Sequence, residues 1–161
     1  MIYPVTLARF VFRMLAPAAC VLLVAGCNGT GTTAPSSTAP FSQVDLRVGS
    51  GAEAAAGNLL TVNYTGWLYD PTSPDLKGLK FETTANSDTP LVFTLGIQQV
   101  IAGWDQGIVG MKVGGIRKLV IPPSLAYGGV RNHPIPPYAT LIFEIELLDV
   151  AAAGSQSALA R

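Results

Sequence analysis

The chain has little of what metal, redox and acid–base enzymes use. Its 161 residues include one histidine, His133, and two cysteines. A single histidine argues against a multi-histidine metal site and limits proton-transfer chemistry. Charged residues make up 12% of the chain, ten basic against ten acidic, without a basic patch, so nucleic acid is not an expected partner. Phosphate-binding glycine loops, nucleophile elbows and the spacing of a catalytic triad are also missing from the sequence.

Residues 1–26 are interpreted as a signal peptide. Arg9 and Arg13 precede an apolar run, Met14 to Ala25, which ends in Gly26-Cys27. A basic start, a short apolar run and small residues before a cleavage point are typical of secretory signals. The run is shorter than the roughly 20 residues that a membrane-spanning helix needs.

The end of this signal leaves two interpretations open. Val24-Ala25-Gly26-Cys27 resembles the lipobox of bacterial lipoproteins, in which the cysteine is lipidated and becomes the first mature residue. The alternative is an ordinary signal peptide, cut near Ala25 or Cys27. Cleavage would remove Cys20, and a lone free thiol is a liability in an oxidising compartment, which favours lipidation of Cys27. Asn28 is not the Asp that usually retains lipoproteins at the inner membrane, so we expect a periplasm-facing lipoprotein of the outer membrane, anchored through Cys27.

Composition divides the rest of the chain into three parts. Residues 27–40 are predicted to be a flexible linker. After Cys27-Asn28 this segment contains only Gly, Thr, Ser, Ala and Pro and has no charged residue, which is typical of such linkers. Residues 151–161 are expected to form a disordered tail. The folded domain is therefore predicted to span residues 41–150.

Hydrophobic alternation predicts an antiparallel sheet in this domain. Leu60, Val62 and Tyr64 share one face of a strand, with polar residues between them. The further strands expected are 80–83, 91–95, 116–121 and 141–147, with one helix at about 101–109 and a long loop at 70–78. Strands around a single helix predict an α+β fold, with one face of the sheet packed on that helix.

The candidate site residues are aromatic and aliphatic rather than reactive. Gly103-Trp104 at the start of the helix suits the floor of a shallow pocket, because a buried aromatic ring supplies a large rigid surface. Tyr127 lies in a predicted turn, where its hydroxyl can face a ligand. Each such residue alone is also compatible with a role in the hydrophobic core. The full set is Tyr64, Phe81, Val100, Ile101, Trp104, Tyr127, Ile135 and Phe143.

A series of motifs that includes these residues occurs in a characteristic order. They are Tyr64-Thr65-Gly66, Phe81-Glu82, Leu95-Gly96, Val100-Ile101-Ala102-Gly103-Trp104, Gly107, Met111, Val113-Gly114, Ile121-Pro122, Ala126-Tyr127-Gly128, Ile135-Pro136-Pro137 and Ala139-Thr140-Leu141-Ile142-Phe143. Over nearly all of residues 41–150 the chain resembles FKBP-type peptidyl-prolyl cis-trans isomerases. The resemblance implies a curved antiparallel sheet wrapped around one short helix, in agreement with the alternation pattern.

The resemblance also implies a role for each site residue. Trp104 would form the pocket floor, the Ile101 backbone N–H would bind one ligand carbonyl, and the Tyr127 hydroxyl would bind another. The remaining roles are aromatic walls at Tyr64, Phe81 and Phe143, a rim at Val100 and Ile101, and a flap residue, Ile135, over the prolyl ring.

Two site positions differ from the family pattern. Glu82 stands where the family usually has Asp, and residues 85–88 contain no arginine to pair with it. Leu91 replaces the aromatic residue that is often found two positions before Phe93. Glu82 is retained as a catalytic residue and Leu91 as a substrate-binding residue, whereas His133 is interpreted as an exposed loop residue.

The function implied is acceleration of X-Pro bond rotation in exported proteins by a desolvated aromatic pocket. This chemistry breaks no covalent bond, so no cofactor and no metal are expected. The implied partners are proline-containing polypeptides, with a macrolide as a further ligand. The departures at Glu82 and Leu91 keep an alternative open: a proline-segment-binding chaperone or interaction module with low turnover.

Overall fold

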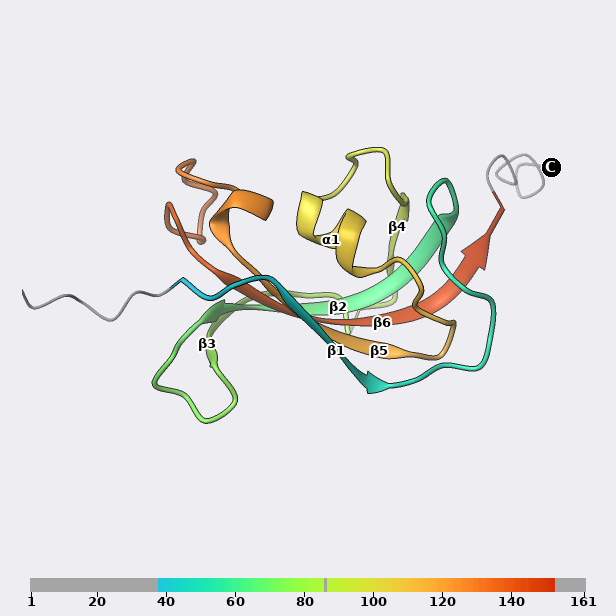
Figure 1. Cartoon of the computed structure of the whole chain (residues 1–161), viewed down its shortest axis with the longest axis horizontal. Helices are drawn as coiled ribbons and strands as arrows, with labels where there is room; N and C mark the ends of the chain where they lie inside the picture. Colours follow the sequence, from blue (N-terminus) through green and yellow to red (C-terminus); the bar gives the residue numbers. More distant parts are fainter. Residues whose placement is uncertain (1–37, 86, 153–161) are drawn as a thin grey trace, which may run out of the picture. The chain divides into compact units, whose positions relative to one another are not determined.

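The computed structural model describes residues 38–85 and 87–152. Within them no helix is long and apolar enough to cross a membrane. The elements follow the chain as β1 (Ser42–Arg47), β2 (Leu59–Tyr69), β3 (Lys77–Thr83), β4 (Leu91–Thr94), α1 (Ala102–Gly107), β5 (Ile116–Ile121), a 3-10 turn (Pro123–Leu125) and β6 (Leu141–Ala151) (Figure 1).

The strands form one antiparallel sheet in the order β1-β5-β6-β2-β3, and β4 also pairs with β2. The long strands β2 and β6 are paired from Leu59 opposite Ala151 to Leu68 opposite Leu141. Leu60, Val62 and Tyr64 are buried and the residues between them are half-buried, which confirms the predicted alternation. The fold class, an α+β sheet packed on one short helix, is also as predicted.

Several boundaries differ from the prediction. The edge strand β1 was not expected, because all six of its residues are exposed and its sequence has no buried face to create a pattern. β3 begins at Lys77, so the loop predicted at 70–78 is shorter than expected. α1 is shorter than residues 101–109, because Ile101 is extended with ψ of 148° and Ile108 caps the other end.

The helix α1 lies on one face of the sheet, above the strands β2, β5 and β6 in the view of Figure 1. Two glycines one turn apart allow it to approach β5. A Cβ atom on Gly103 would lie 2.5 Å from Cγ2 of Ile121, and one on Gly107 would lie 2.7 Å from Cδ2 of Leu119. Both of these β5 side chains are fully buried. The glycines therefore fix the depth at which Trp104, on the same helix, enters the core.

We expect Gly103→Ala to lower the free energy of unfolding by about 1–2 kcal/mol. Alanine favours a helix over glycine by up to about 1 kcal/mol, but its methyl group would force the buried Ile121 side chain to move, and overpacking costs about 1–3 kcal/mol. Urea unfolding of the variant measures the balance. Gln106→Ala, on the exposed side of the same helix, is the control and should leave stability nearly unchanged. A Gly103→Ala protein as stable as the wild type would show that α1 is free to move away from β5.

A buried arginine ties the edge strand to the end of the helix. Arg117 on β5 donates from Nε and Nη2 to the Asp45 carboxylate on β1, at 2.6 and 3.1 Å. Its Nη1 donates to the carbonyl oxygens of Gly107 and Val109, at 2.8 and 3.0 Å. The Arg117 side chain is 8% exposed, and its hydrogen bonds hold the pKa of the Asp45 carboxyl below the usual value. The planar guanidinium therefore joins β1, β5 and the last carbonyls of α1.

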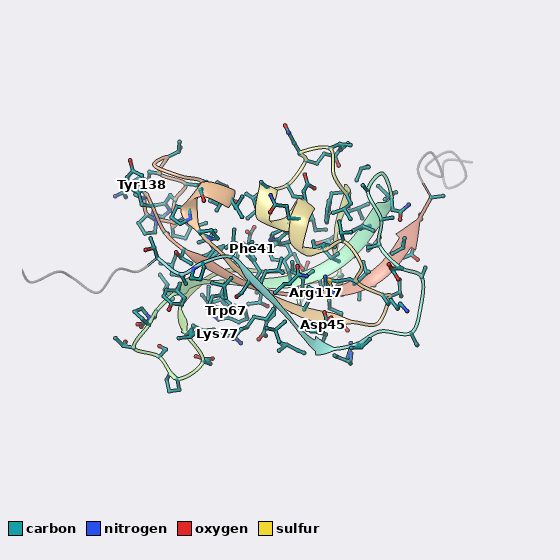
Figure 2. All side chains as sticks on the ribbon, viewed as in Figure 1. Phe41, Asp45, Trp67, Lys77, Arg117 and Tyr138 are labelled. Carbon is teal, nitrogen blue, oxygen red and sulfur yellow. The ribbon has the colours of Figure 1, made fainter. Side chains whose placement is uncertain are left out.

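The face of the sheet opposite α1 carries a cluster of Trp67, Lys77 and Glu144, of which Figure 2 labels Trp67 and Lys77. Lys77 Nζ lies 4.3 Å from the ring centroid of Trp67 and 2.6 Å from the Glu144 carboxylate. Trp67 is paired with Ile142 of β6, which is fully buried. The cluster connects the beginning of β3 to β2 and β6. It lies on the face opposite α1.

Candidate active site

A cavity of about 330 Å³ lies on the face of the sheet that carries α1. Eight of the ten predicted pocket residues line it, which brings together side chains from β2, β3, β4, β6, the helix and the turn after the 3-10 helix. The lining consists of Tyr64, Glu82, Leu91, Gln98, Gln99, Val100, Ile101, Trp104, Tyr127 and Phe143.

Trp104 is held by three aromatic rings. Its ring centroid lies 5.0 Å from that of Tyr64 and 5.2 Å from that of Phe143, in edge-to-face arrangements with interplanar angles of 82° and 89°. Phe93 packs from another side at 5.8 Å. Such contacts are typical of stable aromatic packing. Because the Trp104 side chain is only 4% exposed and cannot tilt freely, it gives the cavity a rigid apolar surface.

Regular pairing with Gly66 places Glu82 on the cavity face of β3, and a bulge at Phe81 adjoins it. Gly66 is paired with Glu82 and the next residue of β2, Trp67, with Lys80, so Phe81 is the extra residue. A bulge changes the direction in which neighbouring side chains point. Gly66 makes room for this arrangement, because a Cβ there would lie 2.6 Å from Cζ of Phe81 and 2.9 Å from Cε1 of Phe143.

Two predicted site residues are not among those that line the cavity. Phe81 packs edge-to-face on Phe143 at 5.7 Å and supports that wall from behind. Ile135 is 5% exposed and belongs to the hydrophobic core. It is held by a tight turn, in which its backbone N–H donates to the Asn132 carbonyl at 2.6 Å. His133, in the same loop, is exposed, as predicted.

Sequence reasoning missed Gln98 and Gln99. They lie between β4 and α1, in a loop that is held by hydrogen bonds: the Asp105 carboxylate accepts from the backbone N–H groups of Gly96 and Gln98, at 2.8 and 3.0 Å. The Gln99 side-chain oxygen accepts from the Thr94 N–H at 2.7 Å. An acidic residue in the first helical turn after a glycine loop was the available signal, because such carboxylates bind nearby backbone N–H groups.

Glu82 is the only charged residue in the cavity lining, which it shares with Tyr64 and Tyr127. Burial raises the pKa of Tyr64, and the negative charge of Glu82 raises it further. Burial and the same charge raise the pKa of Tyr127, whereas a hydrogen bond with Asn132 acts in the opposite direction. Both tyrosines therefore remain protonated hydrogen-bond donors in neutral and mildly alkaline solution.

We expect two tyrosines to ionise late in an alkaline titration followed by ultraviolet absorbance. Since the pKa values of Tyr64 and Tyr127 are raised, their deprotonation should occur above the usual value of about 10. Tyr64→Phe and Tyr127→Phe should each remove part of the late absorbance change. Tyr138→Phe, which removes a ring that is 69% exposed, should leave that late part in place. Loss of the late change in Tyr138→Phe alone would contradict the assignment.

The cavity has no features of a metal centre. Among residues 38–85 and 87–152, no group of three or more His, Cys, Asp and Glu side chains is placed to bind a metal ion. The lining offers an apolar floor, two tyrosine hydroxyls, one carboxylate and the two glutamines Gln98 and Gln99. This arrangement suits noncovalent binding of a small apolar ring and the carbonyl groups beside it.

Comparisons with known proteins agree with this class of site. The model of the family described as FKBP-type peptidyl-prolyl cis-trans isomerase matches residues 50–148. The FK506-binding protein of Neisseria meningitidis serogroup B is 50% identical over 107 residues, which cover 66% of this chain and 92% of that protein. Peptidyl-prolyl cis-trans isomerase FPR2 of Saccharomyces cerevisiae is 46% identical over 103 residues, or 63% of this chain and 71% of that protein.

Solved structures lead to the same fold. The crystal structure of FkpA from Escherichia coli matches with a TM-score of 0.60 and 39% identity, over 70% of this chain and 49% of that one. The structure of AtFKBP13 matches with a TM-score of 0.57 and 38% identity, over 71% and 98%. An antiparallel sheet around one short helix, with an aromatic cavity between them, thus defines a protein of the FKBP class. The chain belongs to the FKBP-type peptidyl-prolyl cis-trans isomerase family, and it is a peptidyl-prolyl cis-trans isomerase.

Proposed function

We propose that the aromatic cavity over Trp104 accelerates X-Pro bond rotation in exported proteins, without a covalent step. The observation that carries the proposal is the placement of Trp104 among three other aromatic rings, with one side of the cluster open to the cavity. A proline ring is the small apolar group that such a floor would bind.

The chemistry follows from the electronic structure of the amide. Resonance resists twisting, with a barrier of roughly 18–20 kcal/mol, and uncatalysed X-Pro rotation takes about 10–100 s. The twisted amide has lost this resonance and is less dipolar than the planar form. A water-poor apolar cavity therefore favours the transition state over the ground state, and each ~1.4 kcal/mol of difference gives a tenfold acceleration.

The site residues divide this work between them. In the proposal Trp104 lies under the prolyl ring and Tyr64 and Phe143 form its walls, with Phe81 supporting Phe143. Ile101 offers its backbone N–H to one substrate carbonyl and Tyr127 its hydroxyl to another. Leu91 and Val100 add apolar rim surface, Glu82 orients the Tyr64 hydroxyl, and Ile135 keeps the flap in place.

The test is a protease-coupled isomerase assay of the chain beginning at Asn28, with an X-Pro tetrapeptide. We expect acceleration, and we expect Tyr127→Phe to lower kcat/KM about fivefold, as for the loss of one hydrogen bond of about 1 kcal/mol. A macrolide of the FK506 type should compete with the peptide, since several relatives are named for binding FK506. Tight peptide binding without acceleration would instead support a proline-binding chaperone or interaction module.

We also propose that the mature protein is a periplasm-facing lipoprotein of the outer membrane, anchored by lipid at Cys27. The support is the lipobox-like sequence before Cys27, and these residues lie outside those that the structure describes. Labelling with a fatty acid in a bacterial host, followed by membrane fractionation, tests it. We expect label in the outer-membrane fraction and none in Cys27→Ser. Label in the inner-membrane fraction would overturn the placement, and an unlabelled wild type would favour an ordinary signal peptide.

A further inference from the structure

Glu82 gives the cavity a negative charge that nothing in the lining balances. The other nine lining residues are neutral. Each ion pair within 4.0 Å among the described residues involves other acids: Arg47 with Glu146, Lys77 with Asp75 and Glu144, and Arg117 with Asp45. No lysine or arginine of residues 38–85 and 87–152 therefore lies within 4.0 Å of the Glu82 carboxylate.

The strand pairing explains why no lysine of β3 lies beside Glu82. Glu82 is paired with Gly66 and lines the cavity, whereas Lys80 is paired with Trp67, whose ring lies on the other face with Lys77 (Figure 2). Glu82 itself is exposed at the cavity rim. Its neighbours in the cavity lining, Tyr64 and Tyr127, are neutral and leave the charge uncompensated.

The charge also acts across the cavity. Glu82, Tyr64 and Tyr127 come from different segments of the chain and line the same cavity, and the charge of Glu82 raises the pKa of both hydroxyls. Tyr64 in turn packs edge-to-face with Trp104, the floor over which the proposed function places the proline ring. A side chain attached to the carbonyl of the rotating bond would thus lie beside the carboxylate.

We propose that Glu82 makes this isomerase selective for X-Pro bonds in which X, the residue before proline, is lysine or arginine. The inference rests on the proposed function, because it requires that the proline ring occupy the floor over Trp104. An incoming ammonium or guanidinium group supplies the missing partner of Glu82, whereas an acidic residue at the same position meets a like charge.

The expected size of this preference follows from the exposure of the carboxylate. Pairs of exposed charges interact weakly, and attraction to lysine and repulsion of glutamate add. We therefore expect kcat/KM for a Lys-Pro peptide to exceed that for a Glu-Pro peptide by about fivefold to tenfold at low salt, with Leu-Pro between them. The ratio should fall toward one as salt is raised, since the screening length shortens from about 10 Å at 0.1 M to 3 Å at 1 M.

The experiment compares Ala-X-Pro-Phe peptides with X as Lys, Leu or Glu, in a protease-free assay by NMR exchange, so that the protease's own preference does not enter. The readout is the ratio of kcat/KM between peptides within one protein, which cancels any general loss of activity. Glu82→Gln should bring the Lys-to-Glu ratio close to one. Glu53→Gln removes an exposed acid that does not line the cavity, and should keep the wild-type ratio.

The outcomes separate the two proposals. Acceleration of all three peptides with equal kcat/KM, or a ratio that persists in Glu82→Gln, overturns the selectivity and leaves the proposed function in place. A ratio lost equally in Glu53→Gln also overturns it, because the effect would then belong to the net charge of the protein. A chain that accelerates none of the peptides overturns the proposed function, and the selectivity with it.

Discussion

Replacing Arg117 by methionine is expected to lower the free energy of unfolding by about 2–4 kcal/mol, because loss of the buried guanidinium leaves two backbone carbonyls unsatisfied while the Asp45 carboxylate, 39% exposed, can be solvated. The guanidinium makes four hydrogen bonds, two to Asp45 and one each to the carbonyl oxygens of Gly107 and Val109. Methionine keeps much of the side-chain volume but donates none of these bonds. It would leave the carbonyl oxygens of Gly107 and Val109 without this donor, and β1 would lose its side-chain attachment to the end of α1.

The rest of the chain provides a matched control. Arg47 forms an ion pair with Glu146 at the same 2.6 Å, but the two side chains are 52% and 37% exposed. Exposed pairs contribute about 0–1 kcal/mol, so Arg47→Met should change urea unfolding little. Equal losses for the two variants would contradict the argument, because burial and the helix carbonyls would then contribute nothing.

The same network sets a dependence on acid. The Asp45 carboxyl has a lowered pKa in the folded protein, so its contribution to stability is present above its unfolded pKa of about 3.9 and is lost as pH falls through the folded value. Asp45→Asn should therefore be less stable than the wild type near neutrality. The difference in unfolding free energy should become smaller below about pH 4.

The parts of the fold that a sequence predicts well are those with a buried face. The alternation in β2 and β6 was readable because one face of each contacts the core, and this indicated the α+β class. β1 was missed for the opposite reason, since an exposed edge strand leaves no hydrophobic period. The Asp45–Arg117 pair was equally invisible, because it joins residues 72 positions apart.

The candidate site also has residues that the sequence predicts and residues that it does not. Family motifs identified the aromatic residues, and eight of the ten predicted pocket positions line the cavity. Phe81, predicted as a wall, and Ile135, predicted as a flap residue, do not line the cavity. Phe81 packs on Phe143 and Ile135 belongs to the core, and a sequence motif does not specify which side chains face a cavity. Gln98 and Gln99 line the cavity through a loop that Asp105 holds. The acidic residue in the first helical turn indicates that such a loop is held, but it does not indicate that the loop faces a cavity.

Trp104 is expected to contribute strongly to catalysis. We expect Trp104→Leu to lower kcat/KM for an X-Pro peptide by about tenfold or more, since a loss of ~1.4 kcal/mol of transition-state stabilisation is sufficient. Leucine is apolar, so the change removes the flat floor and its contacts with Tyr64 and Phe143 rather than the low polarity of the cavity. It also leaves space in the core, and we expect about 2 kcal/mol of lost stability.

A neighbouring residue separates catalysis from stability. Phe93 is as buried as Trp104, at 4% exposure, and packs on its ring at 5.8 Å, but it does not line the cavity. Phe93→Leu should lose a similar amount of stability and keep most of its kcat/KM when both variants are assayed well below their unfolding temperatures. If Phe93→Leu loses as much activity as Trp104→Leu, the effect of Trp104 is one of core packing. If kcat/KM falls only in Trp104→Leu, the indole surface itself contacts the transition state. Both variants replace a buried aromatic ring by leucine, so the loss of core packing is common to them and cannot explain the difference.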